Sequence, residues 1–195
     1  MINILEVIDF FDRRAVDWDR EMIRDSAVIG AILDETGVGP GDRVLDVACG
    51  TGVLIPDYLS RRVRAIDAVD VSPEMIRLAR EHRYEGNVRF LCADAELLAF
   101  DGLYDRIVIY NAFPHFPHPE VLLRHLGRYL KPGGTLTVAH GMSREALKMH
   151  HQGSAEAISR ELPEAAELAA MPHPGLTVTA AISDAQHYQV VWKKQ

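Results

Sequence analysis

Short apolar runs alternate with segments of helical periodicity along the chain. Near-continuous hydrophobic runs are typical of parallel strands that are buried on both faces. Five such runs predict strands at Arg43–Gly50, Arg64–Ser72, Val88–Asp94, Tyr104–Asn111 and Thr135–His140. Apolar positions spaced three and four residues apart predict helices at Ile4–Thr36, Gly52–Arg62, Pro73–His82, Pro119–Leu130, Ser143–His151 and Ser154–Leu168. Strands and helices that alternate in this way favour an α/β fold with a doubly wound, mostly parallel sheet.

The C-terminal part of the chain has a different pattern. Leu176–Ser183 and His187–Trp192 are strand-like runs separated by a short turn, which predicts an antiparallel hairpin. No internal repeat, low-complexity tract or linker interrupts the chain, and 195 residues suit one full-sized domain.

Polar residues and glycines collect where the predicted strands end. In doubly wound sheets, ligands bind beyond the carboxyl ends of the strands, at the point where the strand order reverses. The residues at these ends are Asp46–Gly52, Asp70, Asp94, Asn111 and His140.

The first of these ends, D-V-A-C-G-T-G at Asp46–Gly52, is the strongest candidate binding site. Its two glycines allow a sharp turn and a close approach of a ligand to the backbone. A dinucleotide-binding turn would carry a third glycine where this chain has Ile55. That difference disfavours a nucleotide-dependent oxidoreductase, which stays an alternative.

Three later positions extend the candidate site. Asp70, at the end of the second predicted strand, can accept both hydroxyls of a ribose. Met75 can lie against an adenine, and core packing is its equally weighted alternative. Asp94, followed by Ala95, can receive an adenine amino group, although a lone aspartate after a strand is usually a helix cap.

Four motifs in register resemble class I S-adenosylmethionine-dependent methyltransferases: V-L-D-V-A-C-G-T-G, A-V-D-V-S-P-E-M-I, C-A-D-A-E and L-K-P-G-G-T-L. The resemblance covers about Asp42–His140. It implies a Rossmann-like, seven-stranded sheet that the C-terminal hairpin completes. It also implies one methyltransferase domain over residues 1–195, with a helical lid at 1–40, a cofactor-binding core at 41–140, and substrate-side helices and the hairpin at 141–195.

The resemblance also implies a set of cofactor contacts. The turn at Asp46–Gly52 would hold the amino acid part of S-adenosylmethionine, and Asp70 the ribose. Met75 would lie against the adenine, with Asp94 or Ala95 near its amino group. Phe11 and Trp18 are candidate lid residues, with helix packing as the alternative for each. The full set is Asp46, Ala48, Gly50, Gly52, Asp70, Val71, Met75, Asp94, Ala95, Asn111 and Trp18.

Charge and length restrict the methyl acceptor. The formal net charge of −7 disfavours nucleic acid and anionic membrane surfaces as partners. After the fourth strand, N-A-F-P departs from the N-P-P-aromatic motif of methyltransferases that modify amino groups of nucleobases or glutamine. No domain-sized insertion follows strands four or five, so we expect a small-molecule acceptor and a monomer or a homodimer.

Two further features bear on where the protein works. No apolar run approaches the roughly 20 residues that cross a bilayer, and the acidic N-terminus does not have the pattern of a signal peptide. Cys49 and Cys92 lie in apolar, strand-like runs and are expected to be buried, reduced thiols. These features favour a cytoplasmic protein.

Histidines cluster in the second half of the chain, where seven of nine lie between His115 and His173. They can be surface residues, or His115 and His140 can act with Asn111 as catalytic residues, since histidine suits acid/base work near neutral pH. A minority hypothesis is metal-assisted transfer with an ion bound by His115, His140 and one of His150 or His151.

The predicted function is methyl transfer to a small molecule in a histidine-lined pocket. Two further hypotheses stay open beside it. One is a protein that binds the same cofactor without turnover. The other keeps the methyl transfer and changes the acceptor to a thiol or a metalloid.

Overall fold

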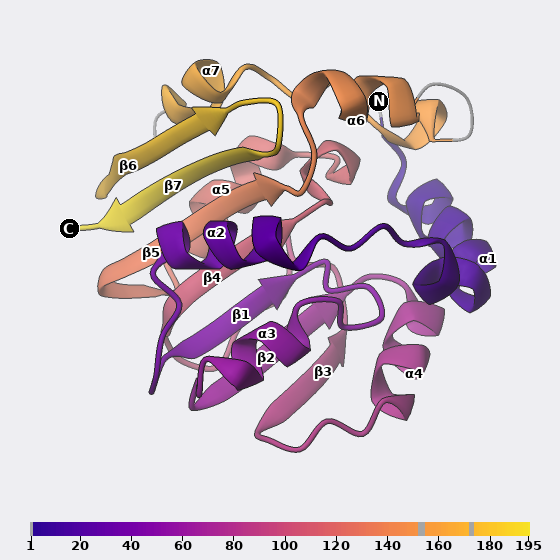
Figure 1. Ribbon diagram of the computed structural model, residues 1–195, viewed down its shortest axis with the longest axis horizontal. Helices are drawn as coiled ribbons and strands as arrows, with labels where there is room; N and C mark the ends of the chain where they lie inside the picture. Colours follow the sequence, from indigo (N-terminus) through magenta and orange to yellow (C-terminus); the bar gives the residue numbers. More distant parts are fainter. Residues whose placement is uncertain (1, 152–154, 172–173) are drawn as a thin grey trace.

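The computed structural model describes residues 2–151, 155–171 and 174–195. Its centre is a seven-stranded sheet with the strand order β3-β2-β1-β4-β5-β7-β6 (Figure 1). The strands are β1 (Arg43–Val47), β2 (Ala65–Asp70), β3 (Val88–Cys92), β4 (Tyr104–Tyr110), β5 (Leu130–His140), β6 (Leu176–Ser183) and β7 (Tyr188–Lys194). Strands β1 to β5 pair in parallel, while β7 pairs antiparallel with both β5 and β6. The mostly parallel sheet and its terminal hairpin confirm the fold predicted from the sequence.

Helices cover both faces of this sheet and its carboxyl edge. They are α1 (Ile4–Glu21), α2 (Ser26–Thr36), α3 (Ile55–Ser60), α4 (Pro73–Glu81), α5 (Pro119–Gly127), α6 (Arg144–His151) and α7 (Ala165–Ala169), with 3₁₀ turns η1 (Phe113–His115) and η2 (Glu156–Ile158). Buried side chains of α2, α3 and α4 belong to one hydrophobic core, and those of α5 and α7 belong to another. Figure 1 shows α1 beyond the arrowheads of the parallel strands, beside α4. No helix in the described ranges is long and apolar enough to cross a membrane.

Successive side chains of the central strands point to opposite faces of the sheet and so pack in the two cores. In β1, Leu45 and Val47 pack in the core below α5 and α7, while Val44 packs in the core below α2, α3 and α4. Asp46 alternates with Val47, so its side chain is directed to the same side as Val44. The sheet thereby buries this carboxylate near α3 and leaves it at the carboxyl edge of the strand.

The chain between β1 and β4 reverses the strand order. From β1 the order runs outward through β2 to β3, and the chain then returns to place β4 on the other side of β1. The carboxyl ends of β1 and β4 therefore flank the switch point at which open α/β sheets bind ligands.

The single helix predicted for Ile4–Thr36 is wrong, because the chain breaks after α1. Met22 is extended (φ −69°, ψ 126°), and Asp25 caps a new helix by accepting the N–H groups of Ala27 and Val28. Asp and Ser are strong helix-capping residues, so the pair Asp25-Ser26 was a start signal inside an apolar periodic run. The predicted 1–40 lid thus divides into α1 at the carboxyl edge and α2, whose Ile29 and Leu33 are buried against the sheet.

The helix predicted for Ser154–Leu168 is also shorter than expected. Between η2 and α7 the chain is extended at Ser159 (φ −125°, ψ 151°). The Arg160 N–H donates to the carbonyl of Pro114 over 3.0 Å, and Pro163 disfavours helical geometry in the residue before it. Tertiary contacts and a proline therefore override the helical periodicity of this segment.

Cys92 departs from the burial predicted for it. Cys49 is buried and Cys92 is exposed, and both are free thiols. Cys92 lies on β3, the edge strand of the sheet, which has a neighbour on one side only. Its apolar sequence context predicted burial that an edge strand does not provide.

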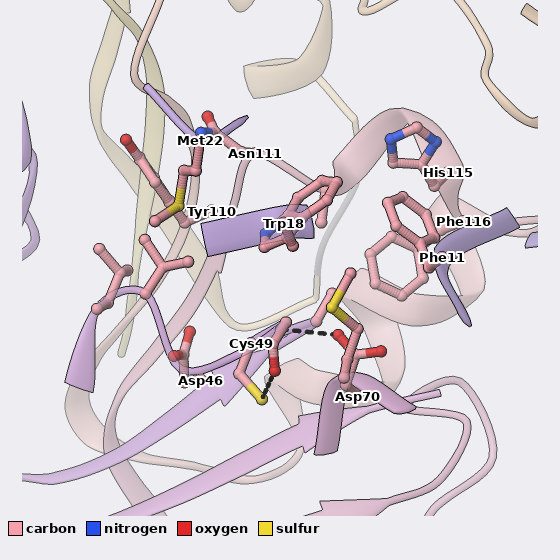
Figure 2. Close-up of a pocket in the computed structure, with 16 residues that line it drawn as sticks. Phe11, Trp18, Met22, Asp46, Cys49, Asp70, Tyr110, Asn111, His115 and Phe116 are labelled. Carbon is pink, nitrogen blue, oxygen red and sulfur yellow. Dashed lines mark hydrogen bonds between the residues drawn. The ribbon is translucent and has the colours of Figure 1, made fainter. Parts of the chain in front are cut away.

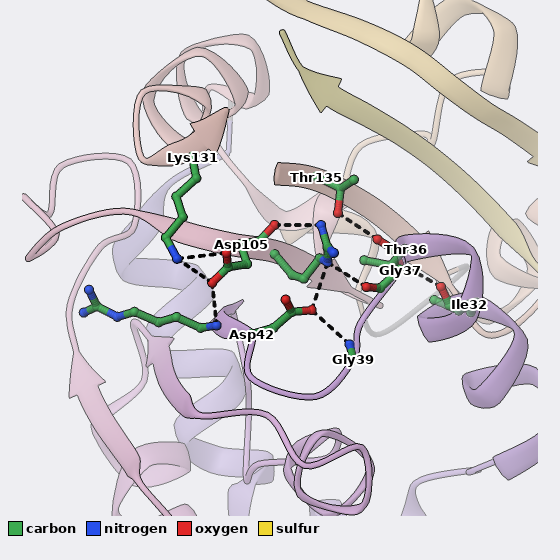
Figure 3. A network of polar contacts seen from close by, with 10 residues as sticks. Ile32, Thr36, Gly37, Gly39, Asp42, Asp105, Lys131 and Thr135 are labelled. Carbon is green, nitrogen blue, oxygen red and sulfur yellow. Dashed lines mark hydrogen bonds and ion pairs between the residues drawn. The ribbon is translucent and has the colours of Figure 1, made fainter. Parts of the chain in front are cut away.

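A polar network fastens the end of α2 to the amino ends of β4 and β5 (Figure 3). Arg106 donates from Nε to the carbonyl of Gly37 over 2.7 Å and to Asp42 over 3.1 Å. Lys131 Nζ lies 2.8 Å from both carboxylate oxygens of Asp105. This network lies at the end of the strands opposite the switch point, so it holds the sheet without contributing to the site.

A second buried charge cluster gives a prediction for stability. Asp67 accepts hydrogen bonds from Arg43 (2.8 Å), Arg89 (2.8 Å) and the hydroxyl of Tyr104 (2.6 Å). Burial alone would raise the pKa of Asp67, but the hydrogen bonds from Arg89, Tyr104 and Arg43 together lower it. Asp67→Asn should reduce the free energy of unfolding at pH 7 by about 2–3 kcal/mol. This loss is smaller than the roughly 3–5 kcal/mol expected for a fully buried ion pair, because both arginines are partly exposed.

The pH dependence of that loss has a definite sign. Because the folded-state pKa of Asp67 is below its unfolded value, the carboxylate stabilises the fold above about pH 4. This stabilisation is lost as the pH falls through the lower folded-state pKa. Urea unfolding at pH 7 and pH 3 should show a smaller decrease for Asp67→Asn than for the wild type, with Asp9→Asn, an exposed aspartate outside this cluster, as control. Equal decreases for the two proteins would contradict this interpretation.

Candidate functional site

The turn after β1 bends sharply at the carboxyl edge of the sheet. Ala48, Gly50 and Gly52 all have positive φ angles, of 58°, 56° and 93°. A Cβ on Gly50 would lie 3.6 Å from Nε1 of Trp18, and one on Gly52 would lie 3.0 Å from the hydroxyl of Tyr84. The two glycines therefore let the turn pass close beneath these rings. A left-handed conformation at a non-glycine residue such as Ala48 stores strain that is typical of functional turns.

Asp70 ties this turn to the end of β2. Its Oδ2 accepts the N–H of Gly50 and its Oδ1 accepts the N–H of Ser72, each over 2.9 Å. Burial raises the pKa of Asp70, and the backbone N–H groups oppose that rise. Each carboxylate oxygen has further lone pairs, so the side chain can accept additional hydrogen bonds from a ligand.

Asp46 presents an unsatisfied buried oxygen. The residue is 2% exposed, and its Oδ1 lies 3.4 Å from the hydroxyl of Tyr58. Its Oδ2 is buried and has no hydrogen-bond partner among the described residues. Burial raises the pKa of Asp46 to about 7, with an opposing effect of the Tyr58 hydrogen bond and a further rise from nearby Asp70. Such an orphaned acceptor is costly unless a ligand donates to it.

These carboxylates line a cleft between the ends of β1 and β4 (Figure 2). Its empty space, including the open mouth, amounts to about 810 Å³. It is lined by Phe11, Trp18, Met22, Asp46, Ala48, Cys49, Gly50, Val53, Leu54, Asp70, Met75, Tyr110, Asn111, Ala112, His115 and Phe116. We call this the inner cleft.

The end of β4 supplies the opposite wall. Asn111 has a left-handed backbone conformation (φ 55°), and its Oδ1 accepts the N–H of Gly141 over 2.9 Å. His115 follows on η1, with its ring edge-to-face against Phe11 at 5.1 Å between centroids. The local strain at Asn111 turns the chain into the cleft immediately after the strand.

The ring of His115 has a defined orientation. Its Nδ1 lies 3.1 Å from the carbonyl oxygen of Ile158 and 3.1 Å from the hydroxyl of Ser159. Because a carbonyl oxygen only accepts, the contact with Ile158 requires a proton on Nδ1. The neutral ring then carries its lone pair on Nε2.

Helix α1 is fastened over the turn by two aspartates. Asp12 accepts from the hydroxyl of Ser72 and, over 3.3 Å, from the N–H of Glu74. Asp19 accepts from the hydroxyl of Thr51 and lies 3.2 Å from Nε2 of His82. These contacts hold Trp18 above Gly50.

A second cleft adjoins the inner one beneath α1, and the two share Phe11, Trp18, Met22, Asn111 and His115. Its other lining residues are Phe10, Arg14, Glu21, Ile23, Met142, Leu147 and Ala155. We call this the outer cleft.

The structure gathers most of the residues that the sequence singled out. Those that line the inner cleft are Phe11, Trp18, Asp46, Ala48, Gly50, Asp70, Met75, Asn111 and His115. Gly52, Val71, Asp94 and Ala95 do not line it. Asp94 accepts the N–H of Glu96 over 2.9 Å, which is the capping role anticipated for a lone aspartate after a strand. Glu96 in turn accepts from the backbone and ring of His118.

His140 does not join His115 in either cleft, contrary to the prediction that both face one pocket. It is fully buried at the end of β5, where it pairs with Tyr188 of β7 and packs against that ring. The antiparallel partner strand covers the end of β5, which the sequence pattern could not reveal. The side chains of His150 and His151 lie outside the described residues. Among the described residues, no group of three or more His, Cys, Asp or Glu side chains could hold a metal ion.

Sequence reasoning missed several residues of the site. Tyr110 and Phe116 line the inner cleft on either side of Asn111 and His115, and their apolar character concealed them. Asp12 and Asp19 could have been grouped from the sequence, because residues seven positions apart lie on the same face of a helix.

Comparison with known proteins identifies the shared architecture. A family model described as a methyltransferase domain matches residues 44–134. The ubiquinone biosynthesis O-methyltransferase of Xanthomonas campestris pv. campestris (strain B100) is 34% identical over 129 residues, covering 64% of this chain and 54% of that protein. The chain thus spans about half the length of the curated relatives it matches.

Two solved structures share the fold over nearly the whole chain. One is a chain of a Haloferax volcanii complex that contains the Trm112 methyltransferase activator, with a TM-score of 0.81, 24% identity, and coverage of 96% of this chain and 97% of that one. The other is the magnesium protoporphyrin IX methyltransferase of Synechocystis PCC 6803 with bound SAH, with a TM-score of 0.75, 16% identity, and coverage of 99% and 100%.

Proposed function

We propose that this chain is a class I S-adenosylmethionine-dependent methyltransferase, which the match of residues 44–134 to a methyltransferase domain supports, and that it transfers a methyl group from S-adenosylmethionine to a small-molecule acceptor. The observation that carries the proposal is the buried Oδ2 of Asp46, which lacks a partner among the described residues and lines the inner cleft. A cationic amino group would satisfy this oxygen with a strong, charge-assisted hydrogen bond.

The charge of the inner cleft fits this ligand. Asp46 and Asp70 both line it, and none of its described lining residues is a lysine or an arginine. S-adenosylmethionine carries positive charge on its amino group and its sulfonium, which outweighs the negative charge of its carboxylate. A dinucleotide would instead bring an anionic pyrophosphate against two carboxylates. The charge therefore supports a methyl donor over the cofactor of an oxidoreductase.

Different residues of the inner cleft would contact different parts of S-adenosylmethionine. Asp46 and the turn through Ala48 and Gly50 would hold the amino acid part, and Asp70 would accept from the ribose hydroxyls. Met75 would contact the adenine. Val71, Asp94 and Ala95 follow β2 and β3 at the same edge of the sheet, and they are proposed contacts of the outer adenosine. Gly52 shapes the turn.

In this proposal the protein aligns the methyl donor with the acceptor and removes the proton of the acceptor hydroxyl. Bound S-adenosylmethionine supplies an electrophilic methyl group. Nε2 of His115, which carries the lone pair when Nδ1 donates to Ile158, takes the proton of an acceptor hydroxyl. Asn111 positions the acceptor opposite His115, and Trp18 with α1 excludes water. His140 has no catalytic role here because it lines neither cleft.

The cellular setting is part of the same proposal. Cys49 and Cys92 are free thiols, which supports a reducing cytoplasm. The relative from ubiquinone biosynthesis, by its name, acts on a small molecule, which supports the same acceptor class for this chain.

The raised pKa of Asp46 makes ligand binding depend on pH. Below a pKa of about 7 the side chain is protonated and neutral, so it attracts an amino group less. The Kd for S-adenosylhomocysteine should fall about tenfold from pH 6 to pH 8 and level off above, since one proton is released per site. Calorimetry between pH 5.5 and 8.5 tests this, and Asp46→Asn should flatten the profile. A flat profile in the wild type would show that Asp46 does not bind the amino group.

Calorimetric titration tests the proposed function directly. Both S-adenosylmethionine and S-adenosylhomocysteine are expected to bind with micromolar Kd, with and without prior treatment with EDTA. Failure of both to bind would contradict the proposal. Loss of binding after chelation would favour metal-assisted transfer instead. Formation of S-adenosylhomocysteine in the presence of an acceptor separates an enzyme from a binding protein without turnover.

A further inference from the structure

The outer cleft has an aromatic wall that leads toward His115. Phe10 and Phe11 meet edge-to-face with ring centroids 5.2 Å apart, and Phe11 meets Trp18 at 5.6 Å and His115 at 5.1 Å. Such rings offer a flat molecule edge and face contacts that add to simple apolar burial. The wall runs from the surface of α1 to the ring that would accept a proton.

A single cation stands at the far end of this wall. Cζ of Arg14 lies 5.7 Å from the centroid of the Phe10 ring. Among the described residues that line the two clefts, Arg14 is the only lysine or arginine. The other charged lining residues are the carboxylates of Glu21, Asp46 and Asp70. An anionic group of a bound molecule would therefore be attracted to Arg14 and repelled from the interior.

The present partner of Arg14 can be exchanged. Its Nη2 lies 2.9 Å from Oε2 of Glu21, and the two side chains are 40% and 49% exposed. An exposed ion pair of this kind contributes little to stability. The guanidinium has five N–H donors in a planar fork, so it can bind a carboxylate beside Glu21 or in its place.

We propose that the outer cleft binds an aromatic acceptor that carries a negatively charged substituent, and that Arg14 holds this substituent. The inference rests on the proposed function, because the reacting hydroxyl is directed to His115 at the inner end of the wall. Arg14 then determines which acceptors bind and in which direction they enter.

Three catechols that differ only in charge test the proposal: 3,4-dihydroxybenzoate, neutral catechol and cationic dopamine. Each is titrated by calorimetry into protein saturated with S-adenosylhomocysteine. The benzoate is expected to bind at least about tenfold tighter than catechol, as one charge-assisted bidentate contact provides. Arg14→Gln should remove that preference while the Kd values of catechol and S-adenosylhomocysteine stay unchanged. The matched control, Glu21→Gln, should keep or increase it.

Several outcomes would overturn the proposal. Equal affinities for the benzoate and catechol would remove the role of Arg14, and tighter binding of dopamine would assign the anchoring role to Glu21. If none of the three binds with a Kd of about 10 mM or tighter to protein that binds S-adenosylhomocysteine, the aromatic class is wrong. Absence of S-adenosylhomocysteine binding would instead refute the proposed function, and the inference with it.

Discussion

Replacing Asp70 with alanine is expected to weaken S-adenosylhomocysteine binding by about 100- to 1,000-fold. The carboxylate would accept the ribose hydroxyls, and hydrogen bonds to a charged group contribute about 1.5–3 kcal/mol each. The same carboxylate also holds the N–H groups of Gly50 and Ser72. Removing the Asp70 carboxylate therefore takes away the contacts with the ribose and also loosens the turn that approaches the ligand.

The Asp70→Ala experiment needs a check on folding. Thermal unfolding should show a protein that still folds, because burial of the Asp70 charge is itself unfavourable and its removal offsets part of the lost hydrogen bonding. Glu74→Ala, in the first turn of the neighbouring helix α4 and with an exposed side chain, is the matched control and should bind normally. Near-normal affinity in a folded Asp70→Ala protein would mean that the ribose lies elsewhere.

Replacing His115 with alanine is expected to lower kcat by about 100- to 10,000-fold, the usual contribution of a positioned general base. The Kd for S-adenosylhomocysteine should change little, since His115 is not among the proposed cofactor contacts. Methyl transfer to 3,4-dihydroxybenzoate, followed as S-adenosylhomocysteine formation, measures the effect.

His118→Ala is the control for His115→Ala. Its ring binds Glu96 and lines neither cleft, so kcat should stay near the wild-type value. A His115→Ala enzyme with unchanged kcat would assign proton removal to solvent or to the acceptor itself. Equal losses in both variants would indicate damage to the shared loop instead.

The sequence predicted the framework of the site because strand ends are visible in hydrophobic patterning. Asp46, Asp70 and Asn111 each follow an apolar run, and parallel strands bring such ends to one edge. The turn at Gly50 could also be predicted, since glycine allows a ligand to approach the backbone closely. The positions of the strands therefore followed from local information, whereas the seven-stranded sheet was implied by the family resemblance.

Other parts depended on contacts between distant segments. The left-handed conformation of Ala48 has no signature in residue type, whereas asparagine is one of the few non-glycine residues that adopt it readily. The orientation of His115 depends on Ile158, 43 residues away, in a segment whose periodicity predicted a helix. His140 was misplaced because the antiparallel pairing of β7 beside β5 decides what covers its side chain.

The most direct test of the site is a crystal structure of the protein with S-adenosylhomocysteine. The amino group should lie within hydrogen-bond distance, about 3.2 Å or less, of Oδ2 of Asp46, with the ribose hydroxyls on Asp70. The adenosine should extend toward Met75 and leave the outer cleft open for an acceptor. A ligand bound with its amino group away from Asp46, or bound outside the inner cleft, would contradict the proposed cofactor site.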